Sequence, residues 1–308
     1  MRGLADAMGL TAEPHIVRPR KLFAALAPWG PPDPDDMGNL RPPYPVLAFA
    51  AGRRTVPILR ALKRLSHGTF TVFLGHPRTR RHGADAIWAP AHDGLSGPGI
   101  VTSLTTPHPY GPAALARLRE SPDPRVAALP KPVAGLLIGG DSRHHSFGPV
   151  EIEALVAAVC AIQAQGFSVA ATTSRRTPVA LVERLRASLS GNPSAFLWTG
   201  EGDNPYGSIL ACADALLVTA DSTNMVSEAV ATTAPVHVFE PAGGHPRLTR
   251  LLNDLIAAER VRRWAGALKF WPVQPLDATT QIASELAQRY QAFQQARSSR
   301  VVESVADH

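Results

Sequence analysis

The feature that most constrains the fold is a repeated alternation of short apolar segments and helical segments in the second half of the chain. Each apolar segment has the length and composition of a strand that is buried on both faces of a sheet. Strands that alternate with helices pair in parallel through right-handed crossovers. The sequence therefore predicts an α/β fold with a doubly wound sheet. The five predicted strands are residues 133–138, 167–172, 195–198, 216–218 and 236–239.

The helical segments between these strands carry recognisable start and stop signals. The segment from Pro149 to about Gln165 has apolar residues on one face, and Gly166 follows it as a common helix stop. Thr177 and Pro178 have the pattern of an N-cap and a first helical position. Three further helices are predicted to begin near Pro205, Ser222 and Pro246, and a long packed helix is predicted over residues 279–296.

The first half of the chain shows a similar pattern after a proline-rich start. Residues 1–45 hold nine of the 29 prolines, which argues against regular structure in residues 28–34 and 41–45. Turn-rich loops then separate short apolar runs. These runs predict strands at 46–50, 70–74, 86–88 and 100–104, with a helix at 55–65.

A second proline-rich stretch, residues 121–132, has the composition of a domain linker. A chain of 308 residues is also long enough for two domains. We therefore expect an N-terminal Rossmann-like domain over residues 1–128, a C-terminal Rossmann-like domain over 129–277, and a helix with a tail over 278–308.

Composition excludes several classes of protein. No run reaches the roughly 18 apolar residues of a membrane-spanning helix, so an integral membrane protein is not expected. The two cysteines give neither a disulfide framework nor a zinc site, and they suit the reducing cytoplasm. The net charge of +6, from 27 Arg and four Lys against 25 acidic residues, points to anionic partners. Because the arginines are not interleaved with aromatic residues, nucleic acid is not an expected partner.

In an open α/β sheet the ligand site lies beyond the carboxyl ends of the strands. The strand at 133–138 is followed by Gly139, Gly140, Asp141 and Ser142. Two glycines allow a sharp turn, and free amide groups in such a turn can bind a phosphate. The alternative is a tight turn without a ligand, since neither a dinucleotide fingerprint nor a P-loop lysine motif is present.

The loop after 167–172 contains Ser174, Arg175 and Arg176 at the start of a helix. Hydroxyl groups, a helix N-terminus and two guanidinium groups together suit an anionic ligand. A solvated arginine pair is the alternative interpretation. His144 and His145 are adjacent in sequence, so they make a poor metal pair, and no metal site is predicted.

The loop after 216–218 leads through Asp221 to a helix start at Ser222 that could cap the helix and contact a phosphate. Glu228, further along that helix, could accept hydrogen bonds from both hydroxyls of a ribose. A capping loop with an exposed glutamate is the alternative. The same segment adds three candidate binding residues, Thr223, Met225 and Ser227.

Other strand-end loops supply further candidates. Asn204 and Tyr206 lie at the same predicted edge, where the tyrosine could stack on a base. In the first half, Gly52 and Arg53 follow one strand. His92 and Asp93 follow another, and they read equally well as a general base with its orienting carboxylate or as a structural hydrogen-bonded pair.

Together these loops resemble the mitochondrial fission family named for the plant Elongated Mitochondria phenotype, including its bacterial members. The second half is also similar, more distantly, to sugar-nucleotide transferases of the glycosyltransferase B fold. The resemblance implies two Rossmann-like domains facing a cleft, with a diphosphate on the glycine loop and the serine-rich helix start, and a ribose on Glu228. The motifs that carry it are 51–54, 90–93, 137–140, 173–178, 204–206, 218–222 and 225–229.

The sequence departs from the family pattern at its beginning. Family members usually have a strand and a glycine-containing loop before the helix matched here by residues 3–10. Either the true start codon lies upstream of Met1, or the first strand of the N-terminal domain is absent. In the wider fold that loop contributes to acceptor binding and catalysis, so its absence would affect activity.

We therefore expect a glycosyltransferase-like protein that binds a nucleoside diphosphate sugar, with uridine as the favoured base, in the cleft between its domains. No metal or other cofactor is expected, and His92 or Asp93 would deprotonate an unidentified acceptor. A lipid acceptor would bring the basic protein to the anionic inner membrane as a peripheral protein. Two alternatives stay open: a non-catalytic adaptor of the fission family at a membrane, and a sugar-nucleotide epimerase that uses His237 and Glu240.

Overall fold

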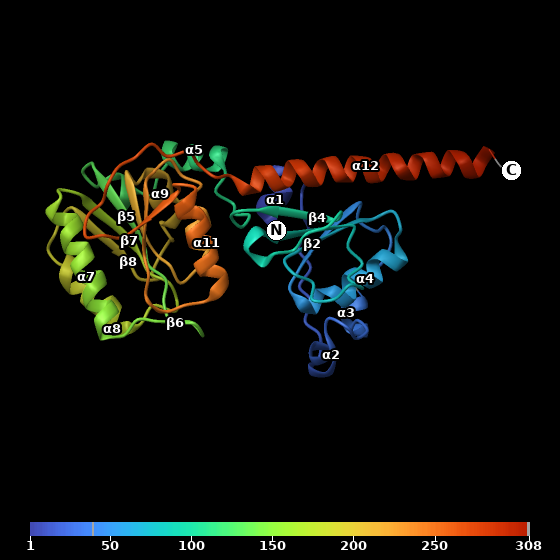
Figure 1. Ribbon diagram of the computed structural model, residues 1–308, viewed down its shortest axis with the longest axis horizontal. Coiled ribbons are helices and arrows are strands. Elements are labelled where there is room, and N and C mark those ends of the chain that lie inside the picture. Colours follow the sequence, from blue (N-terminus) through green and yellow to red (C-terminus); the bar gives the residue numbers. More distant parts are fainter. Residues whose placement is uncertain (39, 307–308) are drawn as a thin grey trace. The chain divides into compact units, whose positions relative to one another are not determined.

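The computed structural model describes residues 1–38 and 40–306 (Figure 1). The chain divides into two compact units. The N-unit comprises Met1–Ser103 together with the chain from Thr279 onward, and the C-unit comprises Leu104–Ala278. Within the described residues, no helix combines the length and the apolar character that crossing a membrane requires.

The C-unit is built on a six-stranded sheet in which every pair of neighbouring strands is parallel. Its order β12-β10-β9-β5-β7-β8 is the doubly wound order 3-2-1-4-5-6 read from the other edge, which confirms the predicted α/β class. The strands are β5 (Val133–Leu137), β7 (Ser168–Thr172), β8 (Ala195–Trp198), β9 (Ala215–Thr219), β10 (Val236–Phe239) and β12 (Val261–Arg263).

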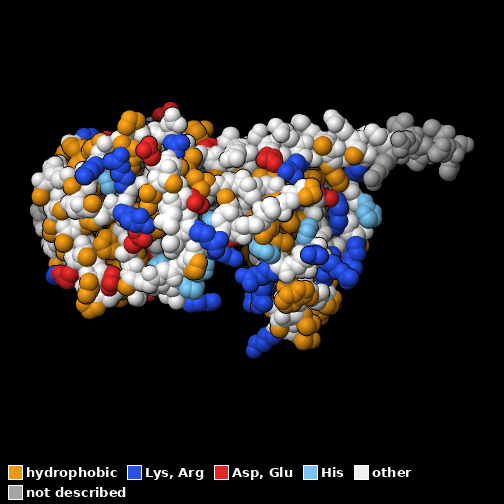
Figure 2. Space-filling model, viewed as in Figure 1, with side chains coloured by type: hydrophobic (Ala, Val, Ile, Leu, Met, Phe, Trp, Pro, Cys, Tyr) orange, Lys and Arg blue, Asp and Glu red, His pale blue; other side chains and the backbone are white. Residues whose placement is uncertain are grey.

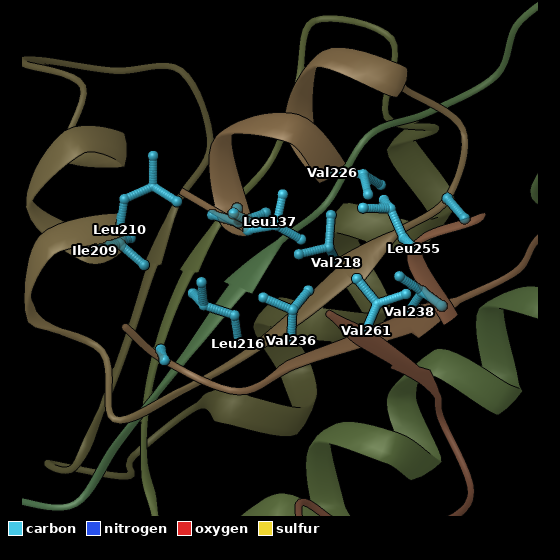
Figure 3. Packing of buried hydrophobic residues seen from close by; sticks show 14 of the residues in the cluster. Leu137, Ile209, Leu210, Leu216, Val218, Val226, Val236, Val238, Leu255 and Val261 are labelled. Atoms are coloured by element: carbon cyan, nitrogen blue, oxygen red, sulfur yellow. The ribbon is translucent and has the colours of Figure 1, made fainter. Parts of the chain in front are cut away.

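Helices cover both faces of this sheet (Figure 1). Buried residues of α7 and α8 pack on one face, and buried residues of α9, α10 and α11 pack on the other. Figure 3 shows the hydrophobic cluster on the face covered by α9, α10 and α11. There Leu137, Val218 and Val238 of three adjacent strands lie together. Burying each such aliphatic side chain contributes about 1.5–3 kcal/mol. The helices are α7 (Pro149–Ala164), α8 (Val179–Leu189), α9 (Tyr206–Cys212), α10 (Thr223–Ala229) and α11 (Pro246–Ala257).

The predicted domain boundary at residue 128 is wrong. Helices α5 (Pro112–Glu120) and α6 (Pro124–Ala127) belong to the C-unit, and their residues Leu115 and Val126 join its core. The backbone amide of Asp123 donates to Ser208 Oγ of α9 at 2.9 Å. Pro124 in this stretch therefore starts a short packed helix, and the stretch is not a linker.

The N-unit contains a four-stranded parallel sheet in the order β1-β2-β3-β4, and all four strands match the sequence prediction. The strands are β1 (Leu47–Ala51), β2 (Phe70–Leu74), β3 (Ala86–Pro90) and β4 (Ile100–Ser103). The helices are α1 (Arg2–Ala7), α2 (Lys21–Leu26), α3 (Pro34–Met37), α4 (Val56–Leu65) and α12 (Ala278–Ala306), with one-turn helices at Arg53–Thr55 and Ala91–Asp93.

The C-terminal helix α12 packs on the N-unit and does not form a separate element. The ring of Phe70 in β2 lies 5.7 Å from that of Tyr290 and 5.3 Å from that of Phe293. The guanidinium group of Arg289 donates to the carbonyl of Ile100 at 3.3 Å. The proline-rich start also holds more structure than expected, since α3 begins at Pro34 within the segment 28–34, with its N-cap Asp33 buried.

Candidate functional site

The strand order of the C-unit identifies the loops that a ligand would use. Strands β5 and β9 are neighbours, and the chain winds outward from them in opposite directions. In doubly wound sheets the ligand crevice lies beyond the carboxyl ends of such a central pair. The loops there begin at Ile138 and Ala220, and they carry the glycines and the polar residues singled out from the sequence.

The glycine loop after β5 is already hydrogen-bonded within the protein. The amide of Gly139 donates to Thr219 Oγ1 at 2.8 Å, and the amide of Gly140 donates to Asp221 Oδ2 at 3.0 Å. The amide of Asp141 donates to the carbonyl of Arg176 at 3.1 Å. The expectation that these amides are free is therefore wrong, and the tight-turn alternative describes this loop.

Asp221 occupies the corner at which an anion would meet the glycine loop. Its side chain is 0% exposed, and its carboxylate also accepts from Thr219 Oγ1 at 2.7 Å and from Arg176 at 3.0 Å. A Cβ atom on Gly139 would lie 2.1 Å from the same carboxylate. Asp221 thus acts as an internal anion that fixes the loops after β5 and β9 to each other.

The two arginines of the next loop have different environments. Arg176 pairs with Asp221 and also donates to the carbonyl of Asp141 at 2.9 Å. Arg175 is exposed, and among residues 1–38 and 40–306 its guanidinium group makes no ion pair. The hydroxyl of Ser174 accepts from the amide of Arg176 at 3.2 Å. Helix α8 starts at Val179, one residue after the predicted first position, because Thr177 bonds back to the glycine loop.

We expect Arg176→Ala to lower the free energy of unfolding by about 1–3 kcal/mol, because it removes the cation beside a buried carboxylate. Arg175→Ala is the matched control, and its free energy of unfolding is expected to stay within about 0.5 kcal/mol of wild type. Urea denaturation of both variants measures the difference. Equal destabilisation by the two substitutions would contradict the assignment of separate roles.

The start of α10 is capped as predicted, with Ser222 Oγ accepting from the amide of Met225 at 3.4 Å. Two other candidates from this segment serve the fold. Ser227 is 0% exposed and accepts from the amide of Thr106 at 3.1 Å, and Met225 packs against the hydrophobic core. Thr223 is the first residue of α10 and is partly exposed.

Glu228 forms a half-buried hydrogen-bonded pair with Tyr206. The Tyr206 hydroxyl donates to Glu228 Oε2, and the ring of Tyr110 lies 5.8 Å from that of Tyr206. Burial raises the pKa of Glu228, although the hydrogen bond from Tyr206 opposes this rise. Burial, together with the nearby Glu228 charge, raises the pKa of Tyr110 to about 12 and the pKa of Tyr206 well above its usual range. A glutamate whose pKa is raised by burial is a candidate binding group.

Asn204 has a positioning role beside this pair. Its Oδ1 accepts from the amide of Tyr206 at 3.0 Å and so fixes the first residue of α9. The exposed-glutamate alternative for Glu228 is not supported, because this side chain is partly buried and hydrogen-bonded. Neither the pairing of Glu228 with Tyr206 nor the closeness of Tyr110 has a signal in the sequence spacing.

A histidine cluster at the same sheet edge was missed by sequence reasoning. Strands β6 (His145–Ser146) and β11 (Ala242–Gly243) form an antiparallel pair that joins the loops after β5 and β10. This pairing brings the rings of His144 and His245 to 4.5 Å. Ser142 lies in the same turn, where its hydroxyl accepts from the amide of His145 at 3.1 Å. Burial lowers the pKa of His145.

The two residues proposed for epimerase chemistry do not face each other as an acid–base pair. His237 is buried within β10, between the rings of Trp264 and Trp271, and burial lowers its pKa to about 4. Glu240 forms an ion pair with Arg263 at 2.5 Å. Both residues are thus committed to contacts within the fold.

The remaining candidates lie in the N-unit, at the carboxyl ends of its strands as predicted. Gly52 follows β1 with a φ of 85°, and the exposed Arg53 begins the next helical turn. His92 and Asp93 follow β3, and His92 is 7% exposed. Among the described residues of both units, no group of three or more His, Cys, Asp or Glu side chains is arranged to hold a metal ion.

The C-unit is therefore a Rossmann-like α/β unit with a half-buried Glu228–Tyr206 pair between α10 and α9, and the N-unit is a second parallel α/β unit. The chain matches the family described as Mitochondrial fission ELM1 over residues 1–290 and belongs to that family. The resemblance drawn from the sequence motifs is thereby confirmed.

A known relative and several solved structures are similar to this chain. The mitochondrial fission protein ELM1 of Arabidopsis thaliana is 29% identical over 276 residues, covering 80% of this chain and 65% of that protein. The chain thus spans less than two thirds of that relative. Similar solved structures include an epimerase from Neisseria meningitidis bound to UDP-GlcNAc (TM-score 0.49, 12% identity, 94% of this chain and 88% of that one). They also include MurG from Acinetobacter baumannii (TM-score 0.43, 15% identity, 85% and 74%).

Proposed function

We propose that the C-unit binds a nucleoside diphosphate sugar at the carboxyl edge of its sheet and that the protein transfers the sugar to an acceptor. The observation that supports this most is the half-buried Glu228–Tyr206 pair, whose glutamate lies in α10, the helix that follows the loop after β9. A desolvated carboxylate is a strong acceptor for the paired hydroxyls of a ribose. Tyr206 holds that carboxylate in place and offers a ring beside the base, for which uridine remains the favoured choice.

The diphosphate end of the proposed ligand relies on Arg175 and the hydroxyl groups around the start of α10. Arg175 is exposed beside the loop whose amides are already used, so its guanidinium group is available to bind phosphate oxygens in a bidentate manner. Ser222 and Thr223 add hydroxyl donors at the neighbouring loop. Charge stabilisation of a leaving diphosphate is commonly the largest contribution to catalysis of such transfers.

In the proposed reaction the acceptor oxygen bonds to the anomeric carbon of the sugar while the bond from that carbon to the diphosphate breaks. The diphosphate leaves with the bonding electron pair, and the acceptor proton passes to a base. His92 and Asp93 of the N-unit are the residues proposed for this base. The acceptor is proposed to be membrane-associated.

Calorimetric titration with UDP-GlcNAc, UDP and 2′-deoxy-UDP tests the proposal. We expect wild type to bind UDP-GlcNAc and UDP, and to bind 2′-deoxy-UDP about tenfold more weakly, because Glu228 loses one ribose hydroxyl. Glu228→Ala should bind all three ligands weakly and no longer distinguish UDP from its deoxy form. Glu240→Ala is the control, since that glutamate lies in an exposed ion pair. Absence of binding by folded wild type would refute the proposal.

A second candidate function is a non-catalytic adaptor of the fission family. The internal hydrogen bonding of the glycine loop by Asp221 favours it, because this corner needs no ligand to be satisfied. An adaptor would bind none of the three nucleotides in the titration described above, so the same experiment separates the two candidates.

A further inference from the structure

The N-unit presents a row of large apolar side chains on the outside of α2. Leu22 and Trp29 are each 67% exposed, and Leu26 is 44% exposed. Leu22 and Leu26 are four residues apart within α2, so they lie on one face of the helix, and Trp29 lies in the turn that follows, where its amide donates to the carbonyl of Leu26 at 3.0 Å. Ile16, just before α2, is 71% exposed. Large apolar side chains grouped on a surface in this way mark an interaction site.

This apolar face is held outward by contacts on its opposite side. Ala24 and Ala27 of the same segment are 9% and 1% exposed, so α2 packs through its small residues. Arg60 of α4 donates to the carbonyl of Trp29, and this hydrogen bond holds the end of the segment against α4. The segment entering α2 is fixed by the ion pair of Arg20 with buried Asp33 at 2.8 Å. The exposure of the apolar row is thus built into the fold.

The positive charge of the protein is concentrated in the same unit. Residues 1–103 contain 13 Lys and Arg against seven Asp and Glu, whereas residues 104–308 contain 18 of each. The whole excess of +6 lies in residues 46–103, which hold eight Lys and Arg against two Asp and Glu, while residues 1–45 hold five of each. Arg18 and Lys21 are exposed next to the apolar row, and Figure 2 shows Lys and Arg side chains beside the hydrophobic side chains at α2.

We propose that this surface docks the protein on an anionic lipid bilayer, with Leu22, Leu26 and Trp29 entering the headgroup region. An amphipathic helix with leucine and tryptophan on one side and basic residues beside it binds at such an interface. Arg18 and Lys21 contact the lipid phosphates while their alkyl chains lie along the apolar region.

Co-sedimentation with vesicles tests the proposal. Wild type is expected to bind vesicles of phosphatidylcholine mixed with phosphatidylglycerol at least about tenfold more tightly than vesicles of phosphatidylcholine alone, and added salt should weaken this binding. The variant Leu22→Ser, Leu26→Ser, Trp29→Ser should lose about tenfold or more in affinity for the anionic vesicles. The variant Arg18→Glu, Lys21→Glu should lose the preference for anionic lipid.

The matched control is Val150→Ser, Val179→Ser, Phe270→Ser, which removes three C-unit side chains that are 76%, 72% and 59% exposed. Its vesicle binding should equal that of wild type. Thermal melts establish that every variant is folded, and exposed substitutions of this kind leave the melting temperature nearly unchanged. Equal binding by the α2 variant and wild type would overturn the proposal. A different result would assign the surface to a second copy of the chain. In that case wild type would not bind vesicles, light scattering would show a dimer, and only the α2 substitutions would dissociate it. The outcome does not depend on nucleotide binding.

Discussion

Replacing Gly140 with alanine is expected to lower the free energy of unfolding by at least ~3 kcal/mol. A Cβ atom at this position would lie 2.1 Å from the carbonyl carbon and oxygen of Arg176, which are backbone atoms that cannot rotate away. Relief requires separation of the loop after β5 from the loop before α8. That movement would also break the hydrogen bond between the Gly140 amide and Asp221.

Urea denaturation measures this effect, and Gly111→Ala is its control in the same unit. A Cβ atom on Gly111 would lie 3.5 Å from Asp277 Oδ2, an ordinary contact distance, so we expect a loss of at most about 1 kcal/mol, which reflects only the replacement of a glycine N-cap of α5 by alanine. If the two alanine variants were equally stable, the loop after β5 could not pack on Arg176 as described.

Replacing Glu228 with glutamine is expected to stabilise the protein above neutral pH while weakening nucleotide binding by at least about tenfold. Burial raises the pKa of Glu228 from its ordinary 4.5, so the folded protein keeps this proton at pH values where the unfolded chain has lost it. The contribution of this group to stability is therefore largest below about pH 4.5 and falls as the pH rises through the raised pKa. Glutamine stays neutral and still accepts a hydrogen bond from Tyr206.

Thermal melts of wild type and Glu228→Gln between acid and alkaline pH measure the stability change. The two proteins should melt alike at low pH, and the variant should melt higher as the pH rises. Calorimetry with UDP measures the loss of binding, which follows because an amide offers one acceptor atom where the carboxylate offers two. Glu240→Gln is the control for both measurements, since Glu240 lies in an exposed ion pair. If the melting temperature of wild type instead rose relative to that of Glu228→Gln as the pH increased, burial could not be raising the pKa of Glu228.

Most strands of the two parallel sheets were predictable because six of the ten are buried along their whole length. Residues of β5, β7 and β9 form continuous apolar or small runs, and such runs have few other readings. The sixth strand of the C-unit, β12, gave no such signal. It has three residues, of which Val261 is buried, while Arg262 and Arg263 are exposed.

The wrong or missing predictions concern residues whose role depends on tertiary contacts. Prolines near residue 124 resemble a linker in sequence, yet Pro124 occupies the first position of a packed helix. The position of Asp221 after a strand suggested a ligand-facing residue, whereas its carboxylate is consumed by the glycine loop and Arg176. His144 and His245 lie far apart in the chain, and only the pairing of β6 with β11 brings them together.

A crystal structure of the protein with a bound nucleoside diphosphate sugar tests the central claim most directly. We predict density for the ribose against Glu228, with the base beside Tyr206 and the diphosphate between Arg175 and Ser222. Two results would contradict the claim that the C-unit binds the nucleotide. One is a nucleotide bound elsewhere on the molecule. The other is a crystal soaked at saturating nucleotide concentration in which Glu228 and Tyr206 contact only each other.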